Sequence, residues 1–160
     1  MLCSILSSQA TADVLYKPSQ GGPATTVGGM NFVYKQEGST GAAGATIIEL
    51  VVAPGAGAPP HRHTKIDESF FILDGVFEVT VDGQTETAAA GAFVQIPGGT
   101  VHSFKNVSKG LARTLTISSP HGLEAYFRAA GKEISNPYEQ VPRGQLHGPS
   151  ESIRYWWLEA

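Results

Sequence analysis

Short apolar runs separated by glycine- and proline-containing turns fill the middle of this chain. The runs are rich in β-branched and aromatic residues, which favour strands. They comprise residues 46–52, 69–73, 76–81, 85–88, 93–96, 101–106 and 112–117. With 19 glycines and 10 prolines in 160 residues, turns are frequent enough to join many short strands. The pattern therefore predicts an all-β sandwich or barrel and argues against a helical bundle.

Local signals at two places sharpen this prediction. Asp82-Gly83 lies between two strand-like runs and is typical of a type I′ hairpin turn. After Pro120 the period changes, and apolar residues at i, i+3, i+4 and i+7 predict one short helix. These residues are Leu123, Tyr126, Phe127 and Ala130, and Gly131 is placed to end the helix.

The length of the chain suits one domain with one core. We expect an N-terminal arm at residues 1–23, a barrel at 24–120, and a C-terminal helix and loop extension at 121–160. A second helix is expected from Ser150 to Leu158, with Ser150 as its cap. Its apolar residues Ile153, Trp156 and Trp157 pack either back on the barrel or against a second subunit.

Charge and composition exclude several classes of partner. The formal net charge is −3 and no basic run is present, so we expect no nucleic-acid partner. No apolar stretch is long enough to span a bilayer, so we expect no membrane partner. Cys3 is the only cysteine, and the short apolar N-terminus lacks the features of a secretory signal. We therefore expect a cytoplasmic protein without a disulfide.

Four side chains have the spacing of a metal site. His61 and His63 stand at i and i+2, so on an extended strand both imidazoles point to the same face. A tight turn after His63 could return Glu68 to the same ion, and His102 would come from another strand. Three imidazoles and one carboxylate suit one divalent transition metal, Fe, Mn, Ni, Co, Cu or Zn, better than Ca or Mg. His121 and His147 are expected to lie outside this site.

The turns around these residues carry a family resemblance. The two motifs are Gly55-x5-His61-x-His63-x4-Glu68-x6-Gly75 and Gly91-x5-Pro97-x-Gly99-x2-His102-x3-Asn106. Together they resemble the cupin superfamily, and specifically its small single-domain members similar to quercetin dioxygenase-like proteins. Ala92 stands where many cupins carry Asp, outside the ligand set.

The resemblance implies a double-stranded β-helix, the jelly-roll cupin barrel, with one or two short C-terminal helices. It also implies that His61, His63, Glu68 and His102 are the metal ligands, and that the protein forms a homodimer. If Glu68 and His102 face inward, strand alternation points Phe70, Ile72 and Phe104 the same way. These three residues either line an apolar substrate pocket or only fill the barrel.

The fold alone does not determine the reaction, so function depends on the site. The resemblance to quercetin dioxygenase-like proteins implies an oxygenase acting on a small aromatic or enol-type substrate, with Glu68 as both ligand and proton acceptor. One alternative is a metal enzyme that does not use dioxygen, either an isomerase or a lyase. The other alternative is a non-catalytic cupin that binds a small ligand.

Overall fold

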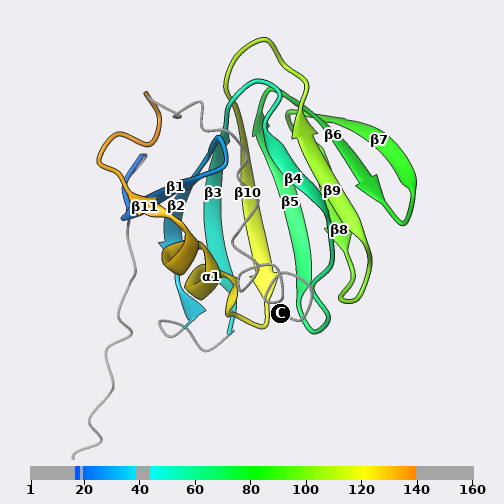
Figure 1. The fold of residues 1–160 in the computed structure, drawn as a ribbon, viewed down its shortest axis with the longest axis horizontal. Coiled ribbons are helices and arrows are strands. Elements are labelled where there is room, and N and C mark those ends of the chain that lie inside the picture. Colours follow the sequence, from blue (N-terminus) through cyan, green and yellow to red (C-terminus); the bar gives the residue numbers. More distant parts are fainter. Residues whose placement is uncertain (1–16, 19, 39–43, 140–160) are drawn as a thin grey trace, which may run out of the picture.

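A computed structural model of the chain describes residues 17–18, 20–38 and 44–139 (Figure 1). The predicted second helix at 150–158, with its two tryptophans, lies outside the described residues, as do Cys3 and His147. The first 16 residues of the predicted N-terminal arm also lie outside them. The described part of the chain contains no helix with the length and hydrophobicity needed to cross a bilayer.

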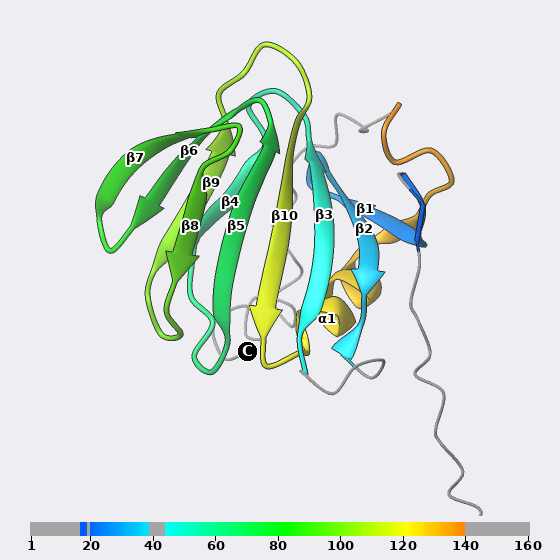
Figure 2. The same ribbon diagram turned by 180° about the vertical axis from the view of Figure 1, so that it is seen from behind.

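The described residues form two antiparallel sheets that face each other (Figures 1 and 2). In spatial order, the seven-stranded sheet contains β11 (Lys132–Glu133), β1 (Ala24–Val27), β2 (Met30–Gln36), β3 (Thr46–Val52), β10 (Ala112–Ser119), β5 (Asp67–Asp74) and β8 (Phe93–Ile96). The four-stranded sheet contains β4 (Gly57–His61), β9 (His102–Asn106), β6 (Val76–Val81) and β7 (Gln84–Ala89). The predicted all-β jelly-roll barrel is confirmed.

The strand predictions succeed where β-branched or aromatic runs are bounded by turn residues. Strands β3, β6 and β8 coincide with the predicted runs 46–52, 76–81 and 93–96. In the hairpin between β6 and β7, Asp82 and Gly83 have φ of 48° and 79°, as a type I′ turn requires. The sequence-based reading missed β1, β2, β4 and β11.

The missed strands have identifiable causes. Strand β4 contains Pro59 and Pro60, which weaken the strand signal, and it lies at the edge of its sheet, where proline is tolerated. Strand β2 is buried on both faces over its first five residues, so it lacks the alternation of a half-exposed strand. On its outer face Asn31 is fully buried, and its side-chain amide donates to the Pro137 carbonyl at 2.7 Å.

The core fills the space between the two sheets. Inward side chains of β3 and β5 meet those of β6 and β9 in one buried cluster. Its aromatic centre is Phe104, whose ring lies edge-on to Phe70 at 5.3 Å and to Phe77 at 6.1 Å between centroids. Burial of each such side chain contributes about 2–3 kcal/mol to stability.

The helix α1 (Leu123–Ala130) packs on the seven-stranded sheet beside β1 to β3, as Figure 1 shows. The predicted helix and its end at Gly131 are confirmed, and the Gly131 N–H donates to the Phe127 carbonyl at 2.9 Å. Leu123 and Phe127 are buried, and the Phe127 ring stacks on Phe32 with centroids 4.0 Å apart. The helix therefore contributes an aromatic side chain to the barrel core.

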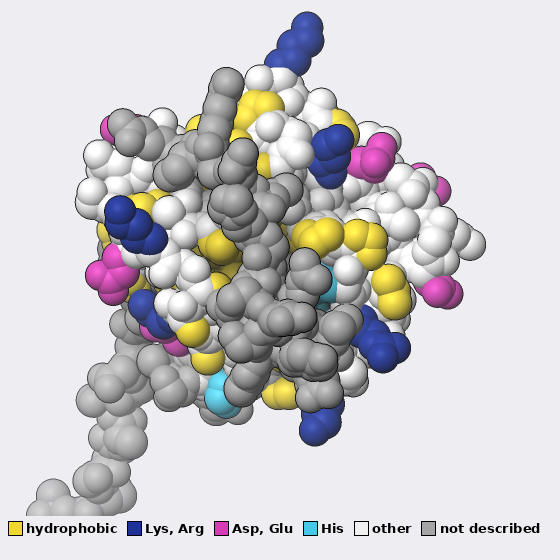
Figure 3. Space-filling model, in the orientation of Figure 1, with side chains coloured by type: hydrophobic (Ala, Val, Ile, Leu, Met, Phe, Trp, Pro, Cys, Tyr) yellow, Lys and Arg dark blue, Asp and Glu magenta, His cyan; other side chains and the backbone are white. Residues whose placement is uncertain are grey.

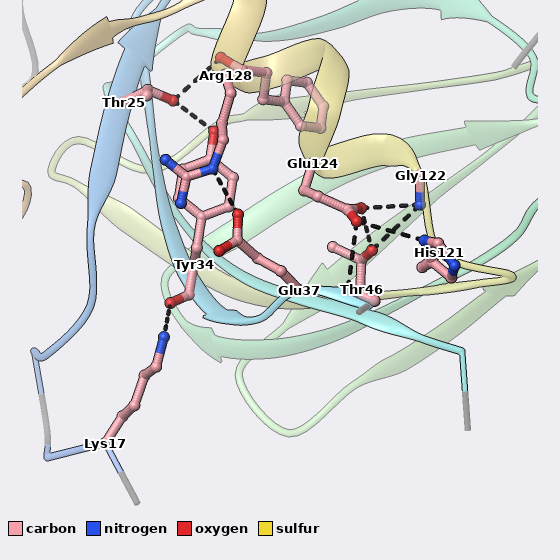
Figure 4. A network of polar contacts seen from close by, with 11 residues as sticks. Lys17, Thr25, Tyr34, Glu37, Thr46, His121, Gly122, Glu124 and Arg128 are labelled. Atoms are coloured by element: carbon pink, nitrogen blue, oxygen red, sulfur yellow. Dashed lines mark hydrogen bonds and ion pairs between the residues drawn. The ribbon is translucent and has the colours of Figure 1, made fainter. Parts of the chain in front are cut away.

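Polar contacts on the outside hold α1 to the sheet (Figure 4). The Glu124 carboxylate accepts hydrogen bonds from the Thr46 hydroxyl and from the backbone N–H of Gly122. The Arg128 guanidinium lies over the Tyr34 ring at 4.2 Å, and its Nε donates to Glu37 at 2.5 Å. These contacts fix the rotation of the helix, and with it the inward direction of Phe127.

Candidate metal centre

The predicted ligands lie at the ends of three strands. His61 is the last residue of β4 and pairs directly with His102, the first residue of β9. His63 follows β4 by two residues, and Glu68 is the second residue of β5. The turn expected between His63 and Glu68 is present as a bend at residues 64–65. Both sheets therefore contribute to one cluster.

The four side chains are buried and close enough to share one ion. One ligand atom from each of His61, His63, Glu68 and His102 lies within 4.8 Å of all the others. Glu68 Oε2 is 3.0 Å from His102 Nε2 and 3.5 Å from His63 Nε2. Each of the four residues is at most 6% exposed.

Backbone carbonyls orient two of the imidazoles. The Nδ1 of His61 lies 2.7 Å from the Pro59 carbonyl oxygen, and the Nδ1 of His102 lies 3.0 Å from that of Thr100. Because a carbonyl oxygen only accepts, each Nδ1 carries the proton and donates it. The Nε2 of each of these two rings then faces the cluster, which is the arrangement that metal-binding histidines commonly show.

The protonation states also suit a metal site. Burial, reinforced by the positive charge of His102, lowers the pKa of His61 to about 3, so this imidazole is neutral near pH 7. Burial alone would raise the pKa of Glu68, but hydrogen bonds from His102 and His63 outweigh it and lower the pKa to about 2. Burial acts to lower the pKa of His102, but its bond to Glu68 outweighs this effect and raises the pKa.

The donor set therefore fits a divalent transition metal. Imidazole nitrogens and one carboxylate oxygen are its usual protein ligands, whereas Ca²⁺ and Mg²⁺ favour oxygen-only sites. A metal ion would replace the proton that His102 shares with Glu68, because only an unprotonated nitrogen coordinates. The identity of the metal is open, since several ions accept this set.

A narrow apolar cavity adjoins the cluster. Besides His61, His63 and Glu68 it is lined by Met30, Phe32, Ile48, Leu50, Ala58, Phe104, Thr116 and Phe127. The centre of a water molecule could move within a volume of about 20 Å³ in this cavity. No lysine or arginine is among these lining residues. The cavity thus offers apolar walls and one charged end.

The structure separates the three predicted pocket residues. Phe104 lines the cavity, whereas Phe70 and Ile72 are buried in the core and do not belong to its lining. The predicted inward orientation is correct for all three side chains, but the Phe70 ring packs against the ring of Phe104. The sequence reading missed the walls from β2, β3, β10 and α1. For α1 a signal was available, because Phe127 lies on the apolar stripe of the predicted helix.

The surface beyond the cavity carries dispersed charge. On the face shown in Figure 3, the visible lysine and arginine side chains are separate from one another, and hydrophobic side chains lie between them. Among the described residues, His121 is exposed and pairs with Glu124 at 3.6 Å, so it lies away from the metal cluster as predicted.

Comparison with known proteins agrees with the fold and the motifs. Residues 48–118 match the family model of the cupin domain. An RmlC-like cupin from Shewanella frigidimarina NCIMB 400 superimposes with a TM-score of 0.59 at 16% identity, over 71% of this chain and 96% of that one. Residues 48–118 are therefore similar to a cupin domain, and the barrel that contains them has the cupin fold.

Within the cupins, the chain resembles quercetin dioxygenase-like proteins. It is 32% identical over 96 residues to quercetin 2,3-dioxygenase from Bacillus subtilis strain 168, covering 59% of this chain and 27% of that protein. It is 35% identical over 77 residues to germin-like protein 1-1 from Oryza sativa subsp. japonica, covering 45% of this chain and 36% of that protein. The chain thus matches well under half the length of either relative.

Proposed function

We propose that this protein is a metal-dependent oxygenase acting on a small aromatic or enol-type substrate. The observation that carries the proposal is a buried cluster of three histidines and one glutamate that faces an apolar cavity. The name of the Bacillus subtilis relative, quercetin 2,3-dioxygenase, supports the same reaction type. The cavity as it stands has room for about one water molecule, so a substrate of either kind would require the walls to move.

The roles of the chain's own residues follow from their chemistry. His61, His63, Glu68 and His102 would hold the ion, and the ion when bound would supply a Lewis acid to a substrate oxygen. Glu68 is ionised near pH 7 and can accept a proton at Oε2. Without the ion, hydrogen bonds from His63 and His102 lower the pKa of Glu68 to about 2. With the ion bound, the basicity of Glu68 would depend on how weakly its carboxylate coordinates.

The cavity walls away from the ion favour an uncharged remainder of the substrate. The ion itself can pair with one negative group, but a second one, as in a dicarboxylate, would be buried with no lysine or arginine in the lining to pair with it. An enol or ketone brings no such charge and presents apolar surface to Phe104 and Leu50. This argument favours small oxygenated compounds over dicarboxylates.

The decisive test is substrate-dependent oxygen uptake. The protein is reconstituted separately with Fe(II), Mn, Co, Ni and Cu, and each form is offered β-diketones, catechols and flavonols in an oxygen electrode. We expect uptake with at least one metal, its loss in a His102→Ala variant, and its retention in His121→Ala. Full metal loading without uptake for any substrate would contradict the oxygenase and leave an isomerase, a lyase or a ligand-binding protein.

The homodimer and the cytoplasmic location remain predictions. Phe71 and Phe93 are 40% and 60% exposed and are paired across β5 and β8, which leaves apolar surface on the outside of the barrel. If this surface joins two copies, Phe93→Glu should halve the mass measured by sedimentation. An unchanged mass would exclude this face as the dimer contact.

A further inference from the structure

Thr116 brings an unsatisfied hydroxyl into the cavity. The inward side chains of β10 include Thr114, Thr116 and Ser118, all of which are buried. The Thr114 hydroxyl donates to the Phe71 carbonyl at 3.1 Å. The Oγ1 of Thr116 is buried and has no hydrogen-bond partner among the described residues, although Thr116 is only 5% exposed. Two neighbouring threonines of one strand therefore differ in whether their hydroxyl is satisfied.

The position of Thr116 relates it to the metal cluster. Ser118 pairs with Glu68 across β10 and β5, and Thr116 pairs with Phe70 in the same ladder and with Ile48 on the other side. Thr116 thus lies two residues along β10 from Ser118, the cross-strand partner of Glu68, which is about 7 Å along the strand. Both residues line the same cavity. A small molecule in the cavity can reach the cluster with one end and Thr116 with another.

An unpaired buried hydroxyl needs a reason. It forfeits a hydrogen bond to water, at a cost comparable to that of a broken hydrogen bond, and native proteins seldom retain such groups. Apart from the metal cluster, Thr116 is the polar side chain of the lining, because the remaining lining residues are apolar. A threonine hydroxyl both donates and accepts, so it can bind a carbonyl as well as a hydroxyl oxygen.

We propose that Thr116 is a specificity-determining residue that binds one oxygen atom of a small, neutral ligand in this cavity. The ligand class is a ketone, enol or alcohol whose remaining atoms are apolar. The inference rests on the proposed function in that it takes the cavity beside the metal cluster as the substrate site. It adds the group that would distinguish an oxygenated substrate from a hydrocarbon of the same shape.

The first test measures stability and needs no substrate. Thr116→Val removes the hydroxyl and keeps the shape, and Thr114→Val is the matched control on the same strand. Because the Thr114 hydroxyl has a partner, its removal should lower the equilibrium constant of folding about fivefold in urea unfolding. Thr116→Val should leave it unchanged or raise it. An equal loss in both variants would show that the Thr116 hydroxyl is structural and would overturn the proposal.

The second test measures binding without turnover. The zinc-loaded protein, with its methyl groups labelled for NMR, is titrated with 2-butanone and with 2-methylbut-1-ene, which has the same shape but no oxygen. The methyls of Ile48, Leu50 and Met30 report on the cavity. We expect Thr116→Val to reduce the preference for the ketone over the alkene about fivefold, and Thr116→Ser to retain it. Metal content is measured in each variant as a control.

The outcomes separate this inference from the proposed function. A ketone preference that falls in Thr116→Val and persists in Thr116→Ser supports the assignment. An unchanged preference would mean that Thr116 pairs with water only, and it would overturn the inference while leaving oxygen uptake to be judged by itself. The absence of cavity shifts with both probes would also overturn it. If the wild-type protein takes up no oxygen with any substrate but the ketone preference falls in Thr116→Val, the proposed reaction type is contradicted. Thr116 then remains a ligand-binding residue.

Discussion

Different kinds of contact form the two ends of the cavity. At one end four polar side chains converge within 4.8 Å, and backbone carbonyls orient two of them. At the other end Phe127 of α1 stacks on Phe32 of β2, and charged contacts outside the barrel hold the helix in place. At the metal end, turns position His61, His63 and Glu68 close together in the chain, and the pairing of β4 with β9 brings in His102. The helix end depends entirely on contacts between residues far apart in the chain.

Because of this difference, one end of the cavity determines its chemistry and the other end determines its shape. The donor atoms of the metal end determine which ions and protonation states are available. The helix end contributes no donor and instead limits the volume beside the cluster. A substitution at the helix end should therefore leave metal binding nearly unchanged. A substitution at the metal end should leave the packing of the helix nearly unchanged. The following predictions test that separation, from the largest expected effect to the smallest.

Removing two ligands should abolish metal binding. We expect the His61→Ala/His63→Ala double variant to lose about half of the roughly 10 kcal/mol or more that a four-ligand site supplies. Elemental analysis after dialysis should then fall from about one equivalent to near zero, while His121→Ala keeps its metal. A full equivalent of metal in the double variant would contradict the ligand assignment.

Truncating the helix end should destabilise the fold and spare the metal. Phe127 is 7% exposed and stacks on Phe32, so Phe127→Ala should cost about 3–5 kcal/mol of unfolding free energy in urea. Metal content should stay at the wild-type level. Val107→Ala is the control, since its side chain is 48% exposed and its loss should cost little. Loss of metal in Phe127→Ala would show that the two ends are coupled.

Glu124 should make the helix end sensitive to acid. Burial by itself would raise its pKa, but hydrogen bonds from Thr46, Gly122 and Gly38 outweigh it, and the pKa is lowered. A carboxylate with a lowered folded-state pKa stabilises the fold above its unfolded pKa, and the contribution disappears as pH falls through the folded value.

The variant Glu124→Gln should therefore lose about 1 kcal/mol near pH 7 and show a flatter decline in stability towards about pH 3 than the wild type. Urea unfolding across this range measures both effects. Glu86→Gln, on an exposed position of β7, is the control and should follow the wild type. Parallel curves for Glu124→Gln and the wild type would exclude Glu124 as a source of the acid sensitivity.

Arg128 should contribute least. Its guanidinium lies over the Tyr34 ring and pairs with Glu37 at a partly exposed position, where such contacts contribute about 0.5–1 kcal/mol. Arg128→Lys retains the charge and loses the planar stacking, so most of this stability should disappear. Equal unfolding free energies for Arg128→Lys and the wild type would show that charge alone holds the helix.

Much of the metal end could be predicted from the sequence. The spacing of His61 and His63 places both rings on one face, and the turn residues around Glu68 and His102 are those of the two cupin motifs. The strand β3 and the hairpin at Asp82-Gly83 were likewise predicted, because alternation and turn chemistry act over a few residues. Where both strand faces are buried, as in β2, that signal disappears.

The tertiary structure alone decided what surrounds the ion. Alternation predicted that Phe70 and Ile72 point inward, but the packing of Phe104 against Phe70 determines which inward residue meets open space. The cavity walls also come from β2, β10 and α1, and the pairing of the strands and the docking of the helix bring them together. The sequence by itself indicated the donor atoms, because the spacing within each motif is local, and the pairing of β4 with β9 brought the two motifs together. The shape of the cavity and the free hydroxyl of Thr116 required the fold, because they depend on contacts between residues far apart in the chain.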